Sequence, residues 1–414
     1  MSKTTEMAAR ARQATLDSGG ATEEQRHAAL ESLAAALLEH QEEILAANAL
    51  DLEAAETNQL SAALVDRLRL SPERIAAIAA GVREIAAQPR VVGQIVAEHR
   101  RDDGLRIKRQ RIPLGVVGMI YESRPNVAVD GAALAVKSGN AIILKGGKEA
   151  RHSNEVIGRV IRAAIDGHLP SELVQVLDST DRGAMNELLT GTDLLDVIVP
   201  RGGEGLIRHV REHARVPVIA HDKGLCHTYV HKDADLQSAA AICLNAKVQR
   251  PGVCNAMETL LLDRSLPDSF VVELIRGFQD AGVEIRGEAD LKALCGDIQP
   301  ATEADWDEEY LDLILSVKRV DGVEAAISHI QQHGSHHSEC ILAQDPAVIA
   351  TFMNRVDASA IMINSSTRFN DGGELGLGAE LGISTSKMHA YGPMGAAEMT
   401  TMRFVVEGEG HCRQ

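Results

Sequence analysis

The stretch "PLGVVGMIYESRPNVAVDGAALAVKSGNAIILK", residues 113–145, begins and ends with short runs rich in Val, Ile and Leu. Two further runs of this kind follow in residues 173–177 and 194–199, and the helical pattern "EVIGRVIRAAIDG" occupies residues 155–167. Strands that alternate with helices predict a parallel sheet wrapped by helices. Because such sheets bind ligands at the carboxyl ends of their strands, the loops after residues 145 and 199 become candidate binding loops.

A second series of strand-like runs, separated by helical patterns, begins near His227 and predicts a second α/β domain. Its members lie in residues 227–230, 257–263, 311–320, 339–343 and 360–366. The first hundred residues are helical in pattern. Thr22 and Gln25 fit a capping box, and Ser71 fits an N-cap followed by Pro72 in the first turn.

Residues 100–114 differ from their surroundings, because charged and apolar residues alternate around an Asp-Gly pair. This pattern predicts an antiparallel hairpin, and residues 400–410 alternate in the same way. A subunit contact and a solitary surface hairpin fit the pattern equally well. The predicted fold class is therefore α/β, with two parallel-sheet domains and a small β-ribbon.

The composition argues against proteins that bind nucleic acid or membranes. The chain has 414 residues, enough for at least two domains, and a formal charge of -17 with only 2% aromatic residues. Such a chain lacks the basic excess and the stacking side chains expected for nucleic acid or anionic membranes. We find no apolar segment of signal-peptide or membrane-span length and expect a cytoplasmic protein. The six cysteines lack CxxC spacing and are expected to be free thiols.

Two glycine-containing loops are candidates for phosphate binding, although the GxGxxG fingerprint is absent. The first follows residues 141–145 and contains Lys145, Gly146, Gly147 and Lys148, whose cations suit phosphate. The second follows residues 194–199 and contains Gly202 and Gly203 before a predicted helix. Ordinary glycine turns at the ends of strands remain the alternative.

Cys254 is the strongest candidate for chemistry from the local sequence. It follows Arg250-Pro251-Gly252 and precedes the strand-like run 257–263, where a loop should feed a strand. A structural cysteine is expected inside an apolar element, whereas a nucleophile needs access and an oxyanion donor, which its own backbone N–H supplies. Arg250 would favour the thiolate. An ordinary exposed thiol fits the local sequence equally well.

Histidines gather in residues 333–340 and 221–227 together with cysteines and a glutamate. Their spacing matches neither HExxH nor a zinc-finger pair, so we predict no metal site. A metal-dependent hydrolase is retained only as a remote alternative.

The order of these segments along the whole chain resembles the aldehyde dehydrogenase superfamily. "KVQRPGVCNAMETLL" resembles its nucleophile segment, and "VIVPRGGEGLI" resembles its second cofactor loop. The segments "YESRPN", "GLCHTYV" and "GELGLGAELGIST" resemble the branch that reduces acyl phosphates. In place of the glutamate that activates water in hydrolytic relatives, this chain has His221 or Asp222.

The resemblance implies roles for individual residues. Cys254 is implied as the nucleophile, Asn126 as a side-chain oxyanion donor, and Glu309 as the ligand of the nicotinamide ribose. Three arginines, Arg124, Arg250 and Arg368, are implied to bind the substrate's carboxylate or phosphate. The implied cofactor loops are the two described above, with Lys145 at the ribose or phosphate.

The resemblance also implies the domains. They are a cofactor domain in residues 1–226 with the oligomerisation hairpin 100–112, a catalytic domain in 227–365, and a return to the cofactor domain with a C-terminal oligomerisation strand in 366–414.

The implied reaction is the NADPH-dependent reduction of L-glutamate 5-phosphate to L-glutamate 5-semialdehyde and phosphate through a cysteine thioester. This is the second step of proline biosynthesis from glutamate. The resemblance also implies a homo-oligomer, and it raises the hypothesis of substrate channelling with glutamate 5-kinase. The alternatives are a dehydrogenase that passes its thioester to coenzyme A, and a non-catalytic scaffold with the same fold.

Overall fold

The computed structural model describes residues 2–177, 182–221 and 223–413. The chain divides into two compact units, each described separately below. Unit 1 comprises Met1–Ala220, Gly376–Gly382 and Met388–Gln414, and unit 2 comprises His221–Leu375 and Ile383–Lys387. In the described part of the chain no helix has the length and apolarity that a membrane crossing requires.

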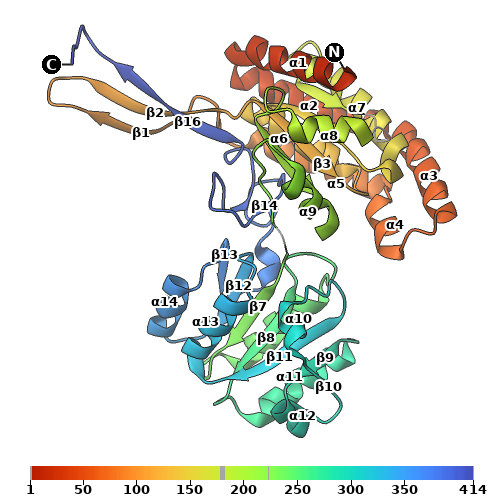
Figure 1. The fold of residues 1–414 in the computed structure, drawn as a ribbon, viewed down its shortest axis with the longest axis vertical. Helices are drawn as coiled ribbons and strands as arrows, with labels where there is room; N and C mark the ends of the chain where they lie inside the picture. The colour runs from red at the N-terminus through yellow and green to blue at the C-terminus, as the bar shows by residue number, and fades with distance from the viewer. Residues whose placement is uncertain (1, 178–181, 222, 414) are drawn as a thin grey trace. The chain divides into compact units, whose positions relative to one another are not determined.

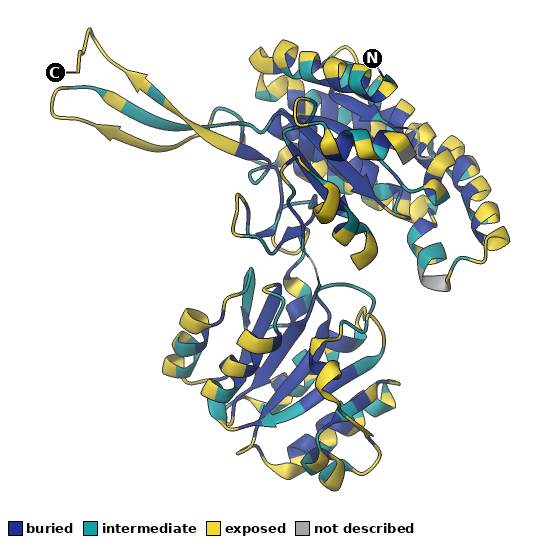
Figure 2. Ribbon diagram, viewed as in Figure 1, coloured by how far each residue is buried: buried dark blue, intermediate teal, exposed yellow. Residues whose placement is uncertain are grey.

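Unit 1 contains a four-stranded parallel sheet in the order β5-β4-β3-β6. Its strands are β3 (Val116–Tyr121), β4 (Ala141–Lys145), β5 (Val174–Val176) and β6 (Val197–Arg201). Every residue of β3 is buried, and so is β4 up to Lys145, as Figure 2 shows for the centre of this unit. Strands covered on both faces read as continuous apolar runs, which is the pattern that predicted them.

Helices cover this sheet and build the N-terminal part of unit 1. They are α1 (Lys3–Asp17), α2 (Glu23–Glu39), α3 (Gln41–Thr57), α4 (Ala62–Leu68), α5 (Pro72–Ala87), α6 (Asn126–Ser138), α7 (Arg151–Ile165), α8 (Arg182–Thr190) and α9 (Glu204–His213), with short 3₁₀ turns η1 (Ser18–Gly20), η2 (Lys148–Ala150) and η3 (Ser171–Leu173). The Thr22–Gln25 capping box and the Ser71 N-cap before Pro72 are both confirmed. Helix α6 packs closely on the sheet because position 131 is glycine, where a Cβ would lie 2.8 Å from the Met119 sulfur.

The predicted hairpin forms an antiparallel ribbon that belongs to unit 1. Strands β1 (Ile95–Arg100) and β2 (Arg106–Pro113) pair around the Asp-Gly turn, and β16 (Thr400–Glu407) pairs with β2 on its other side. Figure 2 shows this ribbon as largely exposed or intermediate, in contrast to the parallel sheets. A short strand β15 (Gly392–Pro393) completes the strands of this unit.

Unit 2 contains a seven-stranded parallel sheet in the order β10-β9-β11-β8-β7-β12-β13. Its strands are β7 (Cys226–Val230), β8 (Met257–Asp263), β9 (Glu284–Gly287), β10 (Gln299–Pro300), β11 (Ile314–Val320), β12 (Ser338–Leu342) and β13 (Ala360–Ile363), followed by β14 (Ile383–Ser384). Its helices are α10 (Leu236–Val248), α11 (Asp268–Asp280), α12 (Ala289–Cys295), α13 (Gly322–His333), α14 (Pro346–Arg355), and the 3₁₀ turns η4 (Glu303–Asp307) and η5 (Thr367–Phe369). The α/β class and both parallel sheets agree with the sequence prediction.

The boundaries of the units differ in part from the predicted domains. The first boundary falls between Ala220 and His221, a few residues before the predicted one. Residues 366–375 belong to unit 2, although the sequence placed them in the C-terminal return. The reason is local bonding, because the Thr367 hydroxyl donates to the Asn255 carbonyl (2.7 Å) and the Asn255 amide donates to the Asn370 carbonyl (3.0 Å).

Candidate active site

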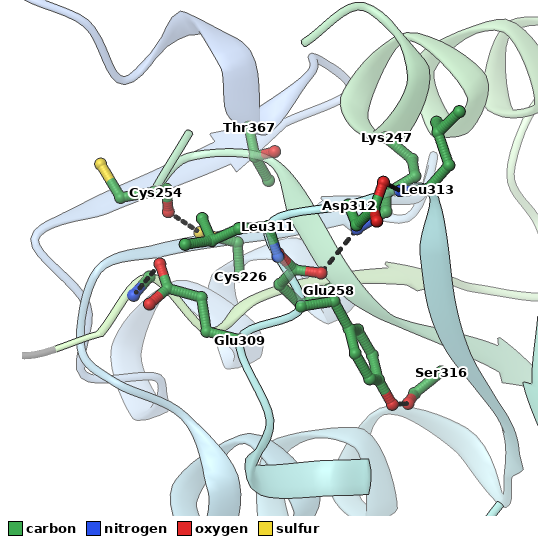
Figure 3. A network of polar contacts seen from close by, with 12 residues as sticks. Cys226, Lys247, Cys254, Glu258, Glu309, Leu311, Asp312, Leu313, Ser316 and Thr367 are labelled. Carbon is green, nitrogen blue, oxygen red and sulfur yellow. Dashed lines mark hydrogen bonds and ion pairs between the residues drawn. The ribbon is translucent and has the colours of Figure 1, made fainter. Parts of the chain in front are cut away.

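Cys254 lies in the turn between α10 and β8 of unit 2, where it is partly exposed. The thiol of Cys226, the first residue of β7, donates to the Cys254 carbonyl at 3.1 Å. Figure 3 shows the Cys254 sulfur pointing away from this contact. Burial raises the pKa of the Cys226 thiol well above its usual range, so Cys226 is held as a neutral donor. The turn therefore fixes the Cys254 backbone and leaves its thiol directed elsewhere.

Gly224 lies directly against the backbone of Cys254. A Cβ at position 224 would lie 2.0 Å from the Cys254 carbonyl oxygen and 2.6 Å from its Cα. No real Cβ tolerates such a distance to backbone, so this close approach requires glycine. The Gly224 N–H donates to the Glu309 carboxylate at 2.9 Å. Glu309 is thereby brought into the same cluster as Cys254, in unit 2.

Two of the three predicted substrate arginines, Arg250 and Arg368, belong to unit 2 with Cys254. Arg368 is partly buried, and its Nε donates to the Gln249 side chain at 2.8 Å. Its pKa is lowered, first by desolvation and further by the Arg250 charge, while the charges of Asp371 and Cys254 act in the opposite sense. Guanidinium groups are suited to binding an anionic ligand.

The segment that carries Arg368 is fastened to the residue next to the thiol. Asn255 is buried, and its amide nitrogen donates to the Arg368 carbonyl (3.4 Å) as well as to that of Asn370. Together with the Thr367 bond, this sets the backbone of Arg368 relative to Cys254. Arg124 differs from the other two arginines, because it precedes α6 in unit 1.

Asn126 is the first residue of α6 and also belongs to unit 1. Its amide nitrogen donates to the Asp130 carboxylate one helical turn later, at 3.1 Å. Burial raises the pKa of Asp130 to about 6, while the bond from Asn126 lowers it. This contact fixes which end of the Asn126 amide carries the donors.

The predicted cofactor loops lie together at the carboxyl edge of the unit 1 sheet, as the fold class requires. Lys145 ends β4, and a Cβ at Gly146 would lie 2.1 Å from the Asn154 amide. A Cβ at Gly202, after β6, would lie 2.4 Å from the Glu122 carboxylate. Both positions therefore require glycine; Gly146 is buried and Gly202 is exposed.

Two carboxylates connect the loops at this edge. Glu149 accepts from the backbone N–H and the hydroxyl of Ser123, at 2.7 and 2.8 Å, and Glu122 accepts from the Gly203 N–H at 2.9 Å. Gly203 is the N-cap of α9, and its own N–H is taken by Glu122. Lys145, Lys148 and the first N–H groups of α9 fit the pyrophosphate of a dinucleotide.

The histidines have partners other than a metal. His227 bonds to Glu339 (3.0 Å), His333 to Asp307 (2.8 Å), and His221 to the Ile383 carbonyl (3.2 Å). Within residues 2–177, 182–221 and 223–413, no group of three or more His, Cys, Asp or Glu side chains is arranged to hold a metal ion. Asp222, the alternative to His221 at the place of the water-activating glutamate, lies outside the described residues.

His329 predicts a pH dependence of stability. It is 7% exposed, its Nε2 finds no hydrogen-bond partner among the described residues, and burial lowers its pKa to about 2. Below pH 6.5 the unfolded chain therefore binds a proton that the folded chain does not, and stability falls as the pH falls. From pH 7.5 to 5.5 the free energy of unfolding of unit 2 should drop by about 1.4 kcal/mol from this group. Denaturant titrations followed by the fluorescence of Trp306, whose ring lies 5.4 Å from that of His329, measure this drop.

The matched variant is His329→Gln, with the exposed His336→Gln as its control. In the His329→Gln chain the free energy of unfolding should no longer fall by this amount between pH 7.5 and 5.5, whereas in the His336→Gln chain it should. An unchanged slope in His329→Gln would contradict the assignment.

Sequence reasoning missed several residues of the site: Glu122, Glu149, Gly224, Asn255 and Thr367. Gly224 had a usable signal, since it is a glycine two residues before a strand of the catalytic domain. Glu149 and Glu122 had no such signal in the sequence, because their hydrogen bonds join residues that are 26 and 81 positions apart in the chain.

Comparison with known proteins identifies the family. The model of the aldehyde dehydrogenase family matches residues 2–292. The gamma-glutamyl phosphate reductase of Moorella thermoacetica is 50% identical over 98% of this chain and 97% of its own length, and that of Brucella anthropi is 48% identical over 99% and 96%.

Solved structures agree in fold. The crystal structure of gamma-glutamyl phosphate reductase from Thermotoga maritima matches with a TM-score of 0.96 and 42% identity. The match covers 100% of this chain and 100% of that one. An acetylating aldehyde dehydrogenase from Geobacillus thermoglucosidasius, 20% identical over 100% of this chain and 98% of its own, shares the fold with a TM-score of 0.71. The chain thus belongs to the aldehyde dehydrogenase family and, within it, to the gamma-glutamyl phosphate reductases.

Proposed function

We propose that this chain reduces L-glutamate 5-phosphate to L-glutamate 5-semialdehyde and inorganic phosphate, with NADPH as the reductant. The observation that carries the proposal is the Cys254 turn, whose backbone is fixed by Gly224 and Cys226 beside two arginines, in a chain half identical to the reductases over nearly its full length. The product is an intermediate of proline biosynthesis.

Cys254 begins the reaction in this proposal. Its thiolate attacks the 5-carbonyl carbon, so a C–S bond forms and the carbonyl oxygen becomes an oxyanion. The backbone N–H of Cys254 and the amide of Asn126 donate to that oxyanion. The C–O bond to phosphate then breaks, inorganic phosphate leaves, and a thioester remains on Cys254.

The hydride that reduces this thioester is supplied by NADPH when it is bound. Lys145, Gly146, Gly147, Lys148, Gly202 and Gly203 hold the cofactor in this proposal. Glu309 orients its nicotinamide ribose, and Lys145 with Lys148 favour the 2′-phosphate that distinguishes NADPH from NADH. After hydride addition the C–S bond breaks, the aldehyde leaves, and the Cys254 thiolate is restored.

The arginines account for substrate selection. Arg250 and Arg368 bind the substrate's α-carboxylate or its phosphate in this proposal, with Arg368 held by its bond to Gln249, and Arg124 is a third candidate. His221 or Asp222 at the place of a water-activating glutamate suits a thioester that must survive until hydride arrives. Hydrolysis would waste the acyl phosphate.

We further propose that copies of the chain associate through the ribbon in a cytoplasmic homo-oligomer. Phe404 and Val406 on β16 are 63% and 57% exposed, which is unusual for large apolar side chains. The acyl phosphate is unstable in water, so association with glutamate 5-kinase would protect it. Sedimentation with and without the kinase tests both associations, and a monomer that ignores the kinase would refute them.

The reverse reaction tests the proposed function. The chain is incubated with glutamate 5-semialdehyde and NADP⁺, and NADPH formation is followed at 340 nm. We expect formation that depends on inorganic phosphate and is insensitive to a chelator. Dependence on coenzyme A instead would identify a CoA-acylating dehydrogenase, and loss with the chelator would identify a metal enzyme.

A further inference from the structure

Residues 308–313, here called the Glu309 loop, connect η4 to β11 and pass over the Cys254 turn. Glu309 bonds to the Gly224 N–H, and the nearest atom to a Cβ at Gly252 would be the Leu311 carbonyl oxygen, at 3.6 Å. Leu311 has a φ of 53°, the left-handed conformation that non-glycine residues rarely adopt. Such a conformation persists only where the surroundings hold it.

Glu258 is one of the groups that hold it. Its Oε1 accepts from the Leu311 N–H at 3.2 Å, and its Oε2 pairs with the Lys247 ammonium at 2.6 Å. The side chains of both ion-pair partners are almost fully buried, at 1% and 0% exposure. Figure 3 shows Glu258 with Lys247, Asp312 and Leu313 on one side and Leu311 and Glu309 on the other.

A β-bulge explains how Glu258 reaches this loop. Cys226 pairs with Met257 and His227 pairs with Thr259, so Glu258 is the extra residue between β7 and β8. A bulge re-aims the side chain of its extra residue, and bulges are common beside active sites. Glu258 lies only four positions after Cys254. The bulge therefore connects the Cys254 turn to the Glu309 loop through one side chain.

Tyr310 anchors the loop from its other side. Its hydroxyl contacts the Asp305 carboxylate and the Ser316 hydroxyl, each at 2.8 Å. The Lys247 ammonium lies 5.9 Å from the centre of the Tyr310 ring. Lys247 is thus paired with the carboxylate that holds the loop and lies within cation–π range of the aromatic ring that anchors it.

We propose that Lys247 and Glu258 are positioning residues, which fix the Glu309 loop so that the Glu309 carboxylate stays aligned for the cofactor ribose. The inference rests on the proposed role of Glu309 in cofactor binding. Neither residue touches the reacting atoms in this account. They act through the Leu311 N–H and the Tyr310 ring.

Each partner of the ion pair favours the charged form of the other. Burial raises the pKa of Glu258 to about 7 and lowers the pKa of Lys247, and in both cases the charge of the partner opposes the shift. A charged acceptor forms a stronger bond with the Leu311 N–H than a neutral one does. Lys247 therefore strengthens the bond that holds the left-handed turn.

The test compares two double variants, because removing one partner alone leaves a buried charge and threatens folding. In K247M/E258Q the side chain at position 258 still has an oxygen that accepts from the Leu311 N–H. In K247M/E258M the side chain at position 258 is also uncharged and of similar size, but it has no oxygen to accept this bond. The measurement is the Kd for NADPH, from the quenching of Trp306 fluorescence, together with thermal unfolding. We expect K247M/E258M to bind NADPH about tenfold more weakly than K247M/E258Q.

A Glu309→Gln background shows whether the effect passes through Glu309. In that background the difference between the two double variants should shrink below about twofold. Asp263→Asn is the control, since it removes a buried carboxylate at the other end of β8, where Asp263 accepts from the Tyr229 hydroxyl at 2.9 Å. That control should leave the Kd unchanged even if it lowers the unfolding temperature.

Equal Kd values for the two double variants, or a difference that persists in the Glu309→Gln background, would overturn the proposal. The binding measurement contains no acyl substrate. A chain that binds NADPH as expected but shows no phosphate-dependent reaction would therefore refute the proposed function and not this inference.

Discussion

Cys254→Ser is expected to lower the rate of phosphate-dependent NADP⁺ reduction by on the order of 10⁴-fold, with an unchanged Kd for NADPH. A serine hydroxyl is far less acidic than a thiol, so far less of it is ionised at neutral pH. The acyl transfer step therefore fails while the loops of unit 1 remain intact. Steady-state rates with glutamate 5-semialdehyde measure the loss.

Cys295→Ser is the matched control, because Cys295 is also partly exposed and lies in unit 2. It should retain wild-type rates. Substantial activity in Cys254→Ser, or an equal loss in Cys295→Ser, would remove Cys254 from the mechanism.

Gly224→Ala is expected to reduce kcat by about 100-fold, because the added methyl group cannot coexist with the Cys254 carbonyl 2.0 Å away. Either the Cys254 turn moves, or the backbone at Gly224 moves and weakens its bond to Glu309. The first movement displaces the nucleophile, and the second displaces Glu309. Stopped-flow measurement of the acyl transfer step locates the loss.

Gly277→Ala provides a comparison within unit 2. Gly277 lies in α11, and the nearest atom to its Cβ would be at 3.6 Å, an ordinary contact. This variant should keep the wild-type kcat. A Gly224→Ala chain that is fully active, with an unchanged unfolding temperature, would contradict the packing described for the Cys254 turn.

The sequence predicted the fold well because both sheets are buried on two faces. Their central strands are mostly apolar runs, and "METLLLD" coincides with β8 from Met257 to Asp263. The strands β9 and β10, at one edge of the unit 2 sheet, are short and partly exposed, and they were not predicted. The candidate cofactor loops were predicted from one rule, that ligands gather at carboxyl ends of parallel strands. Cys254 became a candidate because Pro251 and Gly252 interrupt regular structure just before it.

The rule that ligands gather at the carboxyl ends of strands does not apply to the Cys254 site in unit 2. The Cys254 turn lies at the amino ends of β7 and β8, not at their carboxyl ends. Gly224 and Cys254 are 30 positions apart, and their contact depends on the register of two strands, which includes a bulge. Glu258 appears in the sequence as one acidic residue in an apolar strand, and its partner Lys247 becomes apparent only when α10 is packed on the sheet.

The most direct test of the central claim is the mass of the Cys254 peptide after incubation with glutamate 5-semialdehyde and NADP⁺ without phosphate, quenched in acid. The account predicts a γ-glutamyl thioester on Cys254, which disappears when inorganic phosphate is added before the quench. Cys254 that stays unmodified while NADPH forms, or an adduct that phosphate does not remove, would contradict it.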